Sequence, residues 1–296
     1  MKKLLVFILI ATLCLLPMAF SACGIDVSVI SAEEMLPHCN DSLTTNPLEG
    51  AKNINIQADL YSVAVHNVSG DKVTIDFTQH EKSKVTTSIK DGTLYIVQQW
   101  EPLIATAVRN LYLVVGIPES WQGYTFSADL DVGALSIEQI NADVIDVEMD
   151  TGACMVTTQT ASVVNLESDT GAIIFQGKAG ILTVDVDTGA VKLDGQADKV
   201  IANTDTGAIK VDMLATELHL SSNTGSIVFT VGNNKTIKVQ NDTGSVRGTI
   251  DGVQSHYSIL VDVDTGSCNL KDQIGTETNI LEIDVDTGSV NVTFKQ

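Results

Sequence analysis

Apolar and polar residues alternate along the chain from about residue 125 to the C-terminus. When the segment is aligned on a recurring Asp-Thr-Gly motif, three positions are apolar in every copy. They are the fifth and third residues before the Asp and the second residue after the Gly. Polar residues commonly stand between them, and a period of two indicates strands with one buried face. Each copy therefore predicts a strand, a turn at the motif and a second strand.

The motif recurs every 18 to 22 residues, which is the signature of a repeat architecture. Its glycines are Gly133, Gly152, Gly171, Gly189, Gly207, Gly225, Gly244, Gly266 and Gly288. A single hairpin cannot bury its apolar face, whereas stacked parallel copies form one continuous core with right-handed crossovers. We therefore expect an all-β fold, a right-handed parallel β-solenoid of about nine Asp-Thr-Gly coils that rise about 4.8 Å each.

Each predicted turn has a residue suited to it. Glycine supplies a positive φ at no steric cost, and Asp or Asn at the start accepts hydrogen bonds from nearby backbone N–H groups. Cys154 and Cys268 fall in one inward column six coils apart, so the pattern excludes a disulfide between them. Cys39 has no obvious partner in the sequence.

Shorter strands precede the repeats over residues 51–124, and we expect them to begin the same β-solenoid domain, residues 51–296, and to cap its first coil. Gly70-Asp71 and Asp91-Gly92 mark turns between these strands. Residues 23–50 hold two prolines and no sustained apolar alternation, which predicts a flexible tether. Residues 125–296 then form the regular repeats.

The first 22 residues have the features of a signal peptide, with two lysines followed by a short apolar run. Phe20-Ser21-Ala22-Cys23 resembles a bacterial lipobox, so we expect cleavage before Cys23 and lipid attachment to its sulfur. Such a protein is exported to the cell envelope and anchored in a membrane. The alternative is a plainly secreted protein in which Cys23 has no role.

The charge balance excludes one class of partner. The 296 residues carry 17 Lys and Arg against 37 Asp and Glu, a formal net charge of −20. No basic patch exists that would release counterions from nucleic acid, so we expect no nucleic-acid partner.

Many of the acidic residues fall in two outward columns, the motif Asp and the residue two positions before it. In six copies both positions are carboxylates, and these pairs are Asp129 and Asp131, Glu148 and Asp150, Glu167 and Asp169, Asp185 and Asp187, Asp262 and Asp264, and Asp284 and Asp286. Like charges about 4.8 Å apart repel each other. Ca²⁺, which prefers oxygen ligands, is a candidate cofactor for these ladders, and a solvated acidic face is the alternative.

No enzyme class has a clear signature. An aspartic protease needs two Asp-Thr-Gly loops that face each other, whereas here the motif recurs in register. A carbohydrate-active β-helix enzyme stays open as an alternative, with Arg109, Arg247, Lys192 and Lys210 as its candidate cations. The five histidines show no zinc-ligand spacing.

Several segments resemble the bacterial "putative adhesin" family of β-strand-repeat proteins, a group of largely unknown function. They are the Asn53-Ile-Asn-Ile start, Asp91-Gly-Thr-Leu-Tyr-Ile, the strand over 113–118 and the Thr-Gly repeats. The resemblance covers residues 51–296 and implies a repetitive β fold, with a non-enzymatic role as a surface binding scaffold. It implies an envelope protein or glycan as partner; envelope-stress signalling is a further alternative.

Overall fold

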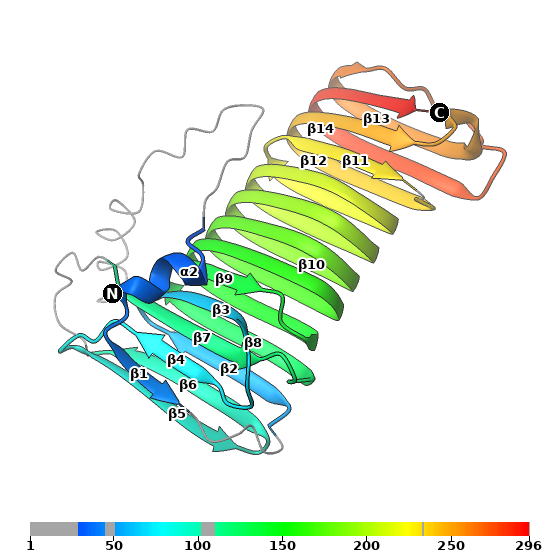
Figure 1. Ribbon diagram of the computed structural model, residues 1–296. Coiled ribbons are helices and arrows are strands. Elements are labelled where there is room, and N and C mark those ends of the chain that lie inside the picture. Colours follow the sequence, from blue (N-terminus) through cyan, green and yellow to red (C-terminus); the bar gives the residue numbers. More distant parts are fainter. Residues whose placement is uncertain (1–28, 45–50, 102–109, 233, 296) are drawn as a thin grey trace.

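The computed structural model describes residues 29–44, 51–101, 110–232 and 234–295. The prediction of an all-β chain is confirmed, because nearly every described element is a strand of one large mixed sheet. Figure 1 shows these strands side by side along an elongated stack, with the single labelled helix at the N-terminal end.

The elements follow in chain order. They are α2 (Ala32–Met35), η1 (Leu36–His38), β1 (Asp41–Thr44), β2 (Asn53–Ala58), β3 (Ser62–Val68), β4 (Thr74–Phe77), β5 (Ser83–Lys90), β6 (Thr93–Trp100), β7 (Tyr112–Pro118), β8 (Gly123–Val132), β9 (Leu135–Glu138), β10 (Ala142–Thr224), β11 (Ile227–Gly232), β12 (Thr236–Asp251), η2 (Gln254–His256), β13 (Tyr257–Cys268) and β14 (Asn279–Lys295).

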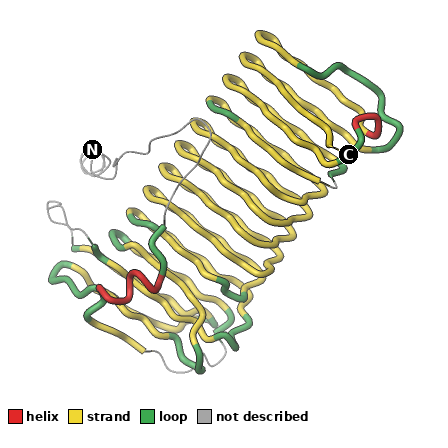
Figure 2. The backbone as a smooth tube through the Cα atoms, turned by 45° about the horizontal axis from the view of Figure 1, so that its top comes forward, coloured by secondary structure: helices red, strands yellow, loops and turns green. Residues whose placement is uncertain are grey.

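The repeats pair in parallel with their motifs in register. Ile145 lies opposite Phe126, and Ile237 lies opposite Leu218, so equivalent positions of two repeats are neighbours. In β10 the strand continues through its copies of the motif without a break. The predicted turns are therefore sites where the ladder of hydrogen bonds persists, because each motif pairs with the motif of the next repeat (Figure 2).

The three apolar columns form the core, as the alternation predicts. Every member of these columns is buried except two residues of β13, Val261 and Cys268, which are partly exposed. The buried column five residues before the motif consists of Phe126, Ile145, Val164, Leu182, Val200, Leu218, Ile237, Ile259 and Leu281. The exceptions identify β13 as a strand at the end of the stack.

The motif glycines form a column in which each residue lies against the backbone of its neighbour. A Cβ atom added at Gly207 would collide with the carbonyl oxygen of Gly189, and one added at Gly225 would collide with that of Gly207. Eight of the nine glycines also have φ between 149° and 159°; Gly288 is the exception. Two independent constraints, sterics and backbone conformation, therefore exclude a side chain at this column.

At the C-terminal end the spatial order of the repeats differs from chain order. Strand β14 pairs with β12 on one side and with β13 on the other, so the final repeat lies between the two before it. The glycine contacts agree, because Gly288 lies against Gly244 and Gly266 lies against Gly288. Cys268 is therefore in the outermost repeat, and the six-coil separation from Cys154 that chain order predicts is wrong.

An analogous exchange occurs at the N-terminal end. Strand β2 lies between β6 and β8, and β3 lies between β7 and β9. These strands pair in parallel, so the stack continues into residues 51–124. The antiparallel strands β1, β4 and β5 lie at this end and make the sheet mixed.

Part of the predicted tether is ordered structure. Strand β1 pairs with β4, and Met35 of α2 is fully buried against β3 and β7. Ser31 caps α2 by accepting a hydrogen bond from the Glu34 N–H, while the Glu34 carboxylate accepts one from the Ser31 N–H. The prediction of a flexible segment over 23–50 is therefore wrong for residues 31–44; lipid attachment at Cys23 lies outside the described residues.

A column of buried polar side chains lies immediately before the motif. Ser168, Thr204, Ser222 and Asn241 are all at most 5% exposed, and Val186 occupies the same column between Ser168 and Thr204. Among the described residues, the three hydroxyl groups have no hydrogen-bond partner. An unpaired buried hydroxyl costs free energy, so these residues reduce the stability of an otherwise apolar core.

We predict that Gly207→Ala lowers the free energy of unfolding by at least about 2 kcal/mol, because it adds a steric collision to an unfavourable φ. The measurement is thermal unfolding followed by circular dichroism. Gly232→Ala is the matched control, since its nearest neighbour would be 3.3 Å away and its φ is ordinary. Equal melting temperatures for the two variants would contradict the role of the column.

Thr204→Val should leave the free energy of unfolding unchanged or raise it by up to about 1 kcal/mol, because it removes an unpaired hydroxyl while keeping the side-chain volume. Urea unfolding measures the difference, with the exposed Thr206→Val as the control. A loss of stability specific to Thr204→Val would show that its hydroxyl is hydrogen-bonded.

Candidate functional site

The two predicted carboxylate columns lie on the surface of the stack. Of the twelve residues in the six acidic pairs, all are exposed except Asp150, which is partly buried. In spatial order the column two positions before the motif contains Asp129, Glu148, Glu167, Asp185, Asn203, Ser221, Gln240, Asp284 and Asp262. This column therefore has two acidic blocks separated by three uncharged polar residues, whereas the motif column keeps Asp205 and Asp242 and is uncharged only at Asn223.

Two carboxyl groups within these blocks have a raised pKa, Glu148 and Asp284. The neighbouring Asp129 is the main cause of a raised pKa at Glu148, with Glu167 and Asp150 adding to it. Loss of hydration raises the pKa of Asp284, and the adjacent Asp262 and Asp286 raise it further. Like charges are therefore the main cause of the shift at Glu148, whereas at Asp284 they add to a larger effect of lost hydration.

The ladders do not converge into a compact ligand set. Within the described ranges, no three His, Cys, Asp or Glu side chains come together as they would to hold a metal ion. One polar contact joins neighbouring motifs, where the Asn223 amide donates a hydrogen bond of 2.9 Å to Asp205. Calcium binding along the ladders stays a prediction.

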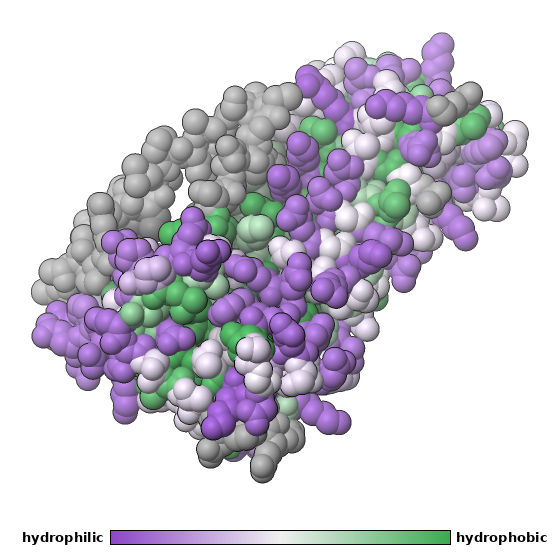
Figure 3. All heavy atoms as spheres, in the orientation of Figure 1, coloured by the Kyte–Doolittle hydropathy of each residue, from purple (hydrophilic) through white to green (hydrophobic). Residues whose placement is uncertain are grey.

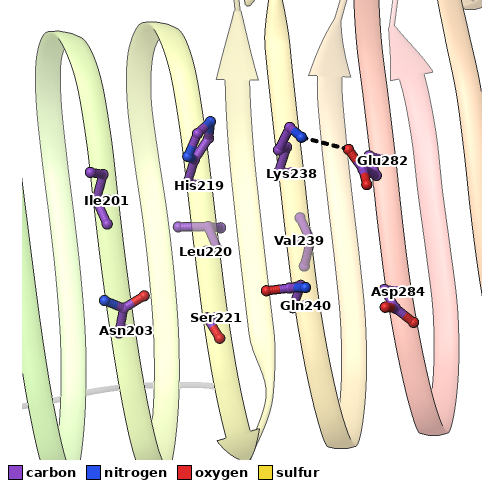
Figure 4. A pocket seen from close by; sticks show the side chains of 10 residues that line it. All are labelled: Ile201, Asn203, His219, Leu220, Ser221, Lys238, Val239, Gln240, Glu282 and Asp284. Atoms are coloured by element: carbon purple, nitrogen blue, oxygen red, sulfur yellow. Dashed lines mark ion pairs between the residues drawn. The ribbon is translucent and has the colours of Figure 1, made fainter.

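The uncharged segment of the ladder coincides with a shallow groove of about 360 Å³. Figure 4 shows two rows of its side chains across neighbouring strands of β10, β12 and β14. One row contains Asn203, Ser221, Gln240 and Asp284, and the other contains Ile201, His219, Lys238 and Glu282. The groove thus combines amide, hydroxyl and imidazole groups with an acidic end.

Two residues of the groove already have their charge state determined: Lys238 is in an ion pair, and His219 has a lowered pKa. Lys238 Nζ lies 2.8 Å from Glu282 Oε2, an ion pair that exists because β14 lies directly beside β12 (Figure 4). Loss of hydration lowers the pKa of His219, and the nearby Lys199 lowers it further. His219 is therefore neutral near pH 7 and can donate one hydrogen bond and accept another.

The candidate cations of the enzyme hypothesis do not line this groove. Lys192, Lys210 and Arg247 follow the motif glycines, on a different segment of the repeat from the groove residues. Arg109 lies outside the described residues. The free thiols also lie elsewhere: Cys154 is buried, whereas Cys39 and Cys268 are partly exposed.

The groove was missed at the level of sequence, although the signal was present. Asn203, Ser221 and Gln240 are consecutive members of a column that is otherwise acidic. The sequence gives no comparable signal for the ion pair between Lys238 and Glu282, because this pair depends on the exchanged order of the last two repeats.

The face seen in Figure 3 carries mostly hydrophilic residues with small, scattered apolar areas. No helix in the described part of the chain has the length and hydropathy of a membrane span.

Comparisons with known proteins found similarity to solved structures alone. No protein-family model matches the chain, and no curated protein sequence matches it. A putative adhesin from Bacteroides fragilis is 14% identical with a TM-score of 0.46, over 90% of this chain and 100% of that one. A putative cell adhesion protein from Clostridium sporogenes is 14% identical with a TM-score of 0.23, over 86% and 99%. A putative adhesin from Parabacteroides merdae is 9% identical with a TM-score of 0.39, over 86% and 96%.

We predict that the melting temperature rises when the pH falls from 7 toward about 5, because Glu148 and Asp284 bind protons more readily in the folded state than in the unfolded chain. A group of raised pKa destabilises the folded state at high pH, and protonation relieves this effect. Added NaCl at pH 7 should act in the same direction by screening the repulsion. Glu148→Gln should reduce both responses, and a melting temperature that falls steadily below pH 7 would contradict the interpretation.

Proposed function

We propose that the protein is an exported, non-enzymatic binding scaffold of the bacterial cell envelope, anchored through a lipid on Cys23. Its repeats form a right-handed β-solenoid, and the groove at Ser221 holds a partner, either an envelope glycan or an envelope protein. The interruption of the acidic ladder by Asn203, Ser221 and Gln240 is the observation that carries this proposal.

The interruption changes what the surface can bind. Along the acidic blocks, a partner must compensate closely spaced negative charges before it can approach. At the groove, two amides and a hydroxyl replace those charges, and each both donates and accepts hydrogen bonds. A neutral polar partner, with hydroxyl or amide groups of its own, is therefore best accommodated there.

The architecture supports a binding role because it is rigid and repetitive. Parallel register extends over β10, β12 and β14, so the groove residues are held by hydrogen-bonded strands instead of loops. Sites built on such elements keep their geometry and lose little conformational entropy when a partner binds.

A carbohydrate-active enzyme is the second candidate, favoured by one observation. Glu282 and Asp284 are both in the groove, two residues apart on one strand, with Lys238 beside them. Paired carboxylates perform glycoside hydrolysis when a sugar lies between them. Here Glu282 is already engaged by Lys238 and both carboxylates face an open, shallow surface, which favours binding over catalysis.

The test uses the full chain, expressed in its own bacterium and mixed after purification with washed peptidoglycan sacculi or with envelope membranes. We expect the protein to sediment with one of these fractions. Ser221→Asp should reduce the bound amount at least about tenfold, because it restores a carboxylate within the interrupted segment.

Asp185→Asn is the matched control, since it alters charge in the same column outside the groove and should keep binding. Cys23→Ala should release the protein from the membrane fraction of intact cells without changing its affinity for sacculi. Binding that is unaffected by Ser221→Asp would overturn the groove assignment. Release of soluble sugar that is lost in Asp284→Asn would instead establish the enzyme.

A further inference from the structure

One exposed ring stands out among the Phe, Trp and Tyr side chains of the described ranges, near the start of β8 and far along the chain from the groove. Tyr124 is 61% exposed, whereas every other aromatic residue in the described ranges is buried or partly buried. It lines a hollow of about 320 Å³ together with Lys52, Asn53, Gln122, Gly123 and Asp143. Core packing does not explain why this aromatic ring is exposed among polar residues, so its position needs another explanation.

A cation and a carboxylate flank the ring on neighbouring segments, Lys52 immediately before β2 and Asp143 in β10. The Tyr124 N–H donates to the carbonyl of Lys52, and the register of β10 with β8 places Asp143 on the other side of Tyr124. Adjacent strands are about 4.8 Å apart, so Lys52 and Asp143 flank the ring at the distance of the next strand.

The ring is held on a rigid base. Trp121 is 7% exposed, and its indole N–H donates a hydrogen bond of 3.1 Å to the carbonyl of Ala51. A Cβ atom at Gly123 would collide with that indole, so glycine is required for the chain to pass over it. The Gly123 N–H is also bonded to the Asn141 carbonyl, which fixes the start of β8.

One polar atom at the hollow lacks a partner. The Asn53 amide donates to Thr93, but its Oδ1 has no hydrogen bond among the described residues although it is shielded from solvent. Gln122, Lys52 and Asp143 are exposed and supply further donors and acceptors around the ring.

We propose that this hollow is a carbohydrate subsite that holds one pyranose ring against Tyr124. The face of an aromatic ring is negative, so it attracts the C–H groups on the flat side of a sugar whose hydroxyls are equatorial. Those hydroxyls point outward in the ring plane, where amide, ammonium and carboxylate groups surround Tyr124. The subsite deepens the proposed binding function by naming its ligand class, and it is separate from the groove at Ser221.

The experiment is saturation-transfer NMR with the full chain and cellohexaose, a β-1,4-linked glucose oligomer with equatorial hydroxyls. We expect transfer to the axial ring protons and a dissociation constant on the order of 1 mM, as befits one exposed sugar site. Tyr124→Ala should weaken binding at least about tenfold, whereas Tyr124→Phe should keep it, since the ring is retained.

Leu214→Ala is the control for loss of an exposed apolar side chain elsewhere on the stack. Absence of transfer to cellohexaose, or undiminished transfer in Tyr124→Ala, would overturn the subsite. Ser221→Asp should leave cellohexaose binding intact, so failure of the groove and failure of the subsite give different results.

Discussion

The close contact between motif glycines is the constraint on which the rest of the structure depends. From Gly152 onward, each motif glycine lies against the carbonyl oxygen of the glycine in a neighbouring repeat, in a space that admits no side chain; Gly133 lies against the Tyr61 carbonyl in the same way. The contact aligns one motif with another in neighbouring repeats, and parallel register then extends from it along both strands of the repeat. The buried columns, the acidic ladders and the groove are all consequences of that register.

The exchanged order of the repeats at the C-terminal end determines which side chains meet at the groove. At the C-terminal end, β14 pairs with β12 over residues 280–295 and with β13 over residues 279–290, so most of β14 has a strand on each side. The exchange also places Glu282 beside Lys238 and Asp284 at the end of the uncharged segment. A groove with one acidic end is therefore a product of topology as much as of composition.

The sequence predicts the all-β class and the core with good accuracy, because a period of two assigns each residue to a face. It predicts Phe126, Ile145 and their equivalents as buried, and they are. It could not predict the exchanged order, because the motifs of β13 and β14 are identical and either could follow β12. The one signal was length: the last two spacings are 22 residues, and the extra residues form η2 and the connection between β13 and β14.

The candidate sites were harder to predict than the core. The groove lies where uncharged residues interrupt an acidic column, and a pattern of carboxylates does not reveal what such an interruption can bind. Tyr124 lies before the first aligned column, so the alternation of the repeats does not predict its exposure. Residues 31–44 contain too few apolar residues to indicate a strand, yet β4 pairs with them.

The most direct test of the repeat order is disulfide formation between engineered cysteines in a chain whose Cys39 and Cys268 are replaced by Ser. Residues 238 and 282 are directly opposite each other on adjacent strands, within the range that a disulfide spans. Residues 238 and 260 are separated by β14, at about twice the strand spacing. We expect Lys238→Cys with Glu282→Cys to oxidise to a disulfide and Lys238→Cys with Leu260→Cys to stay reduced; the reverse result would contradict the exchanged stack.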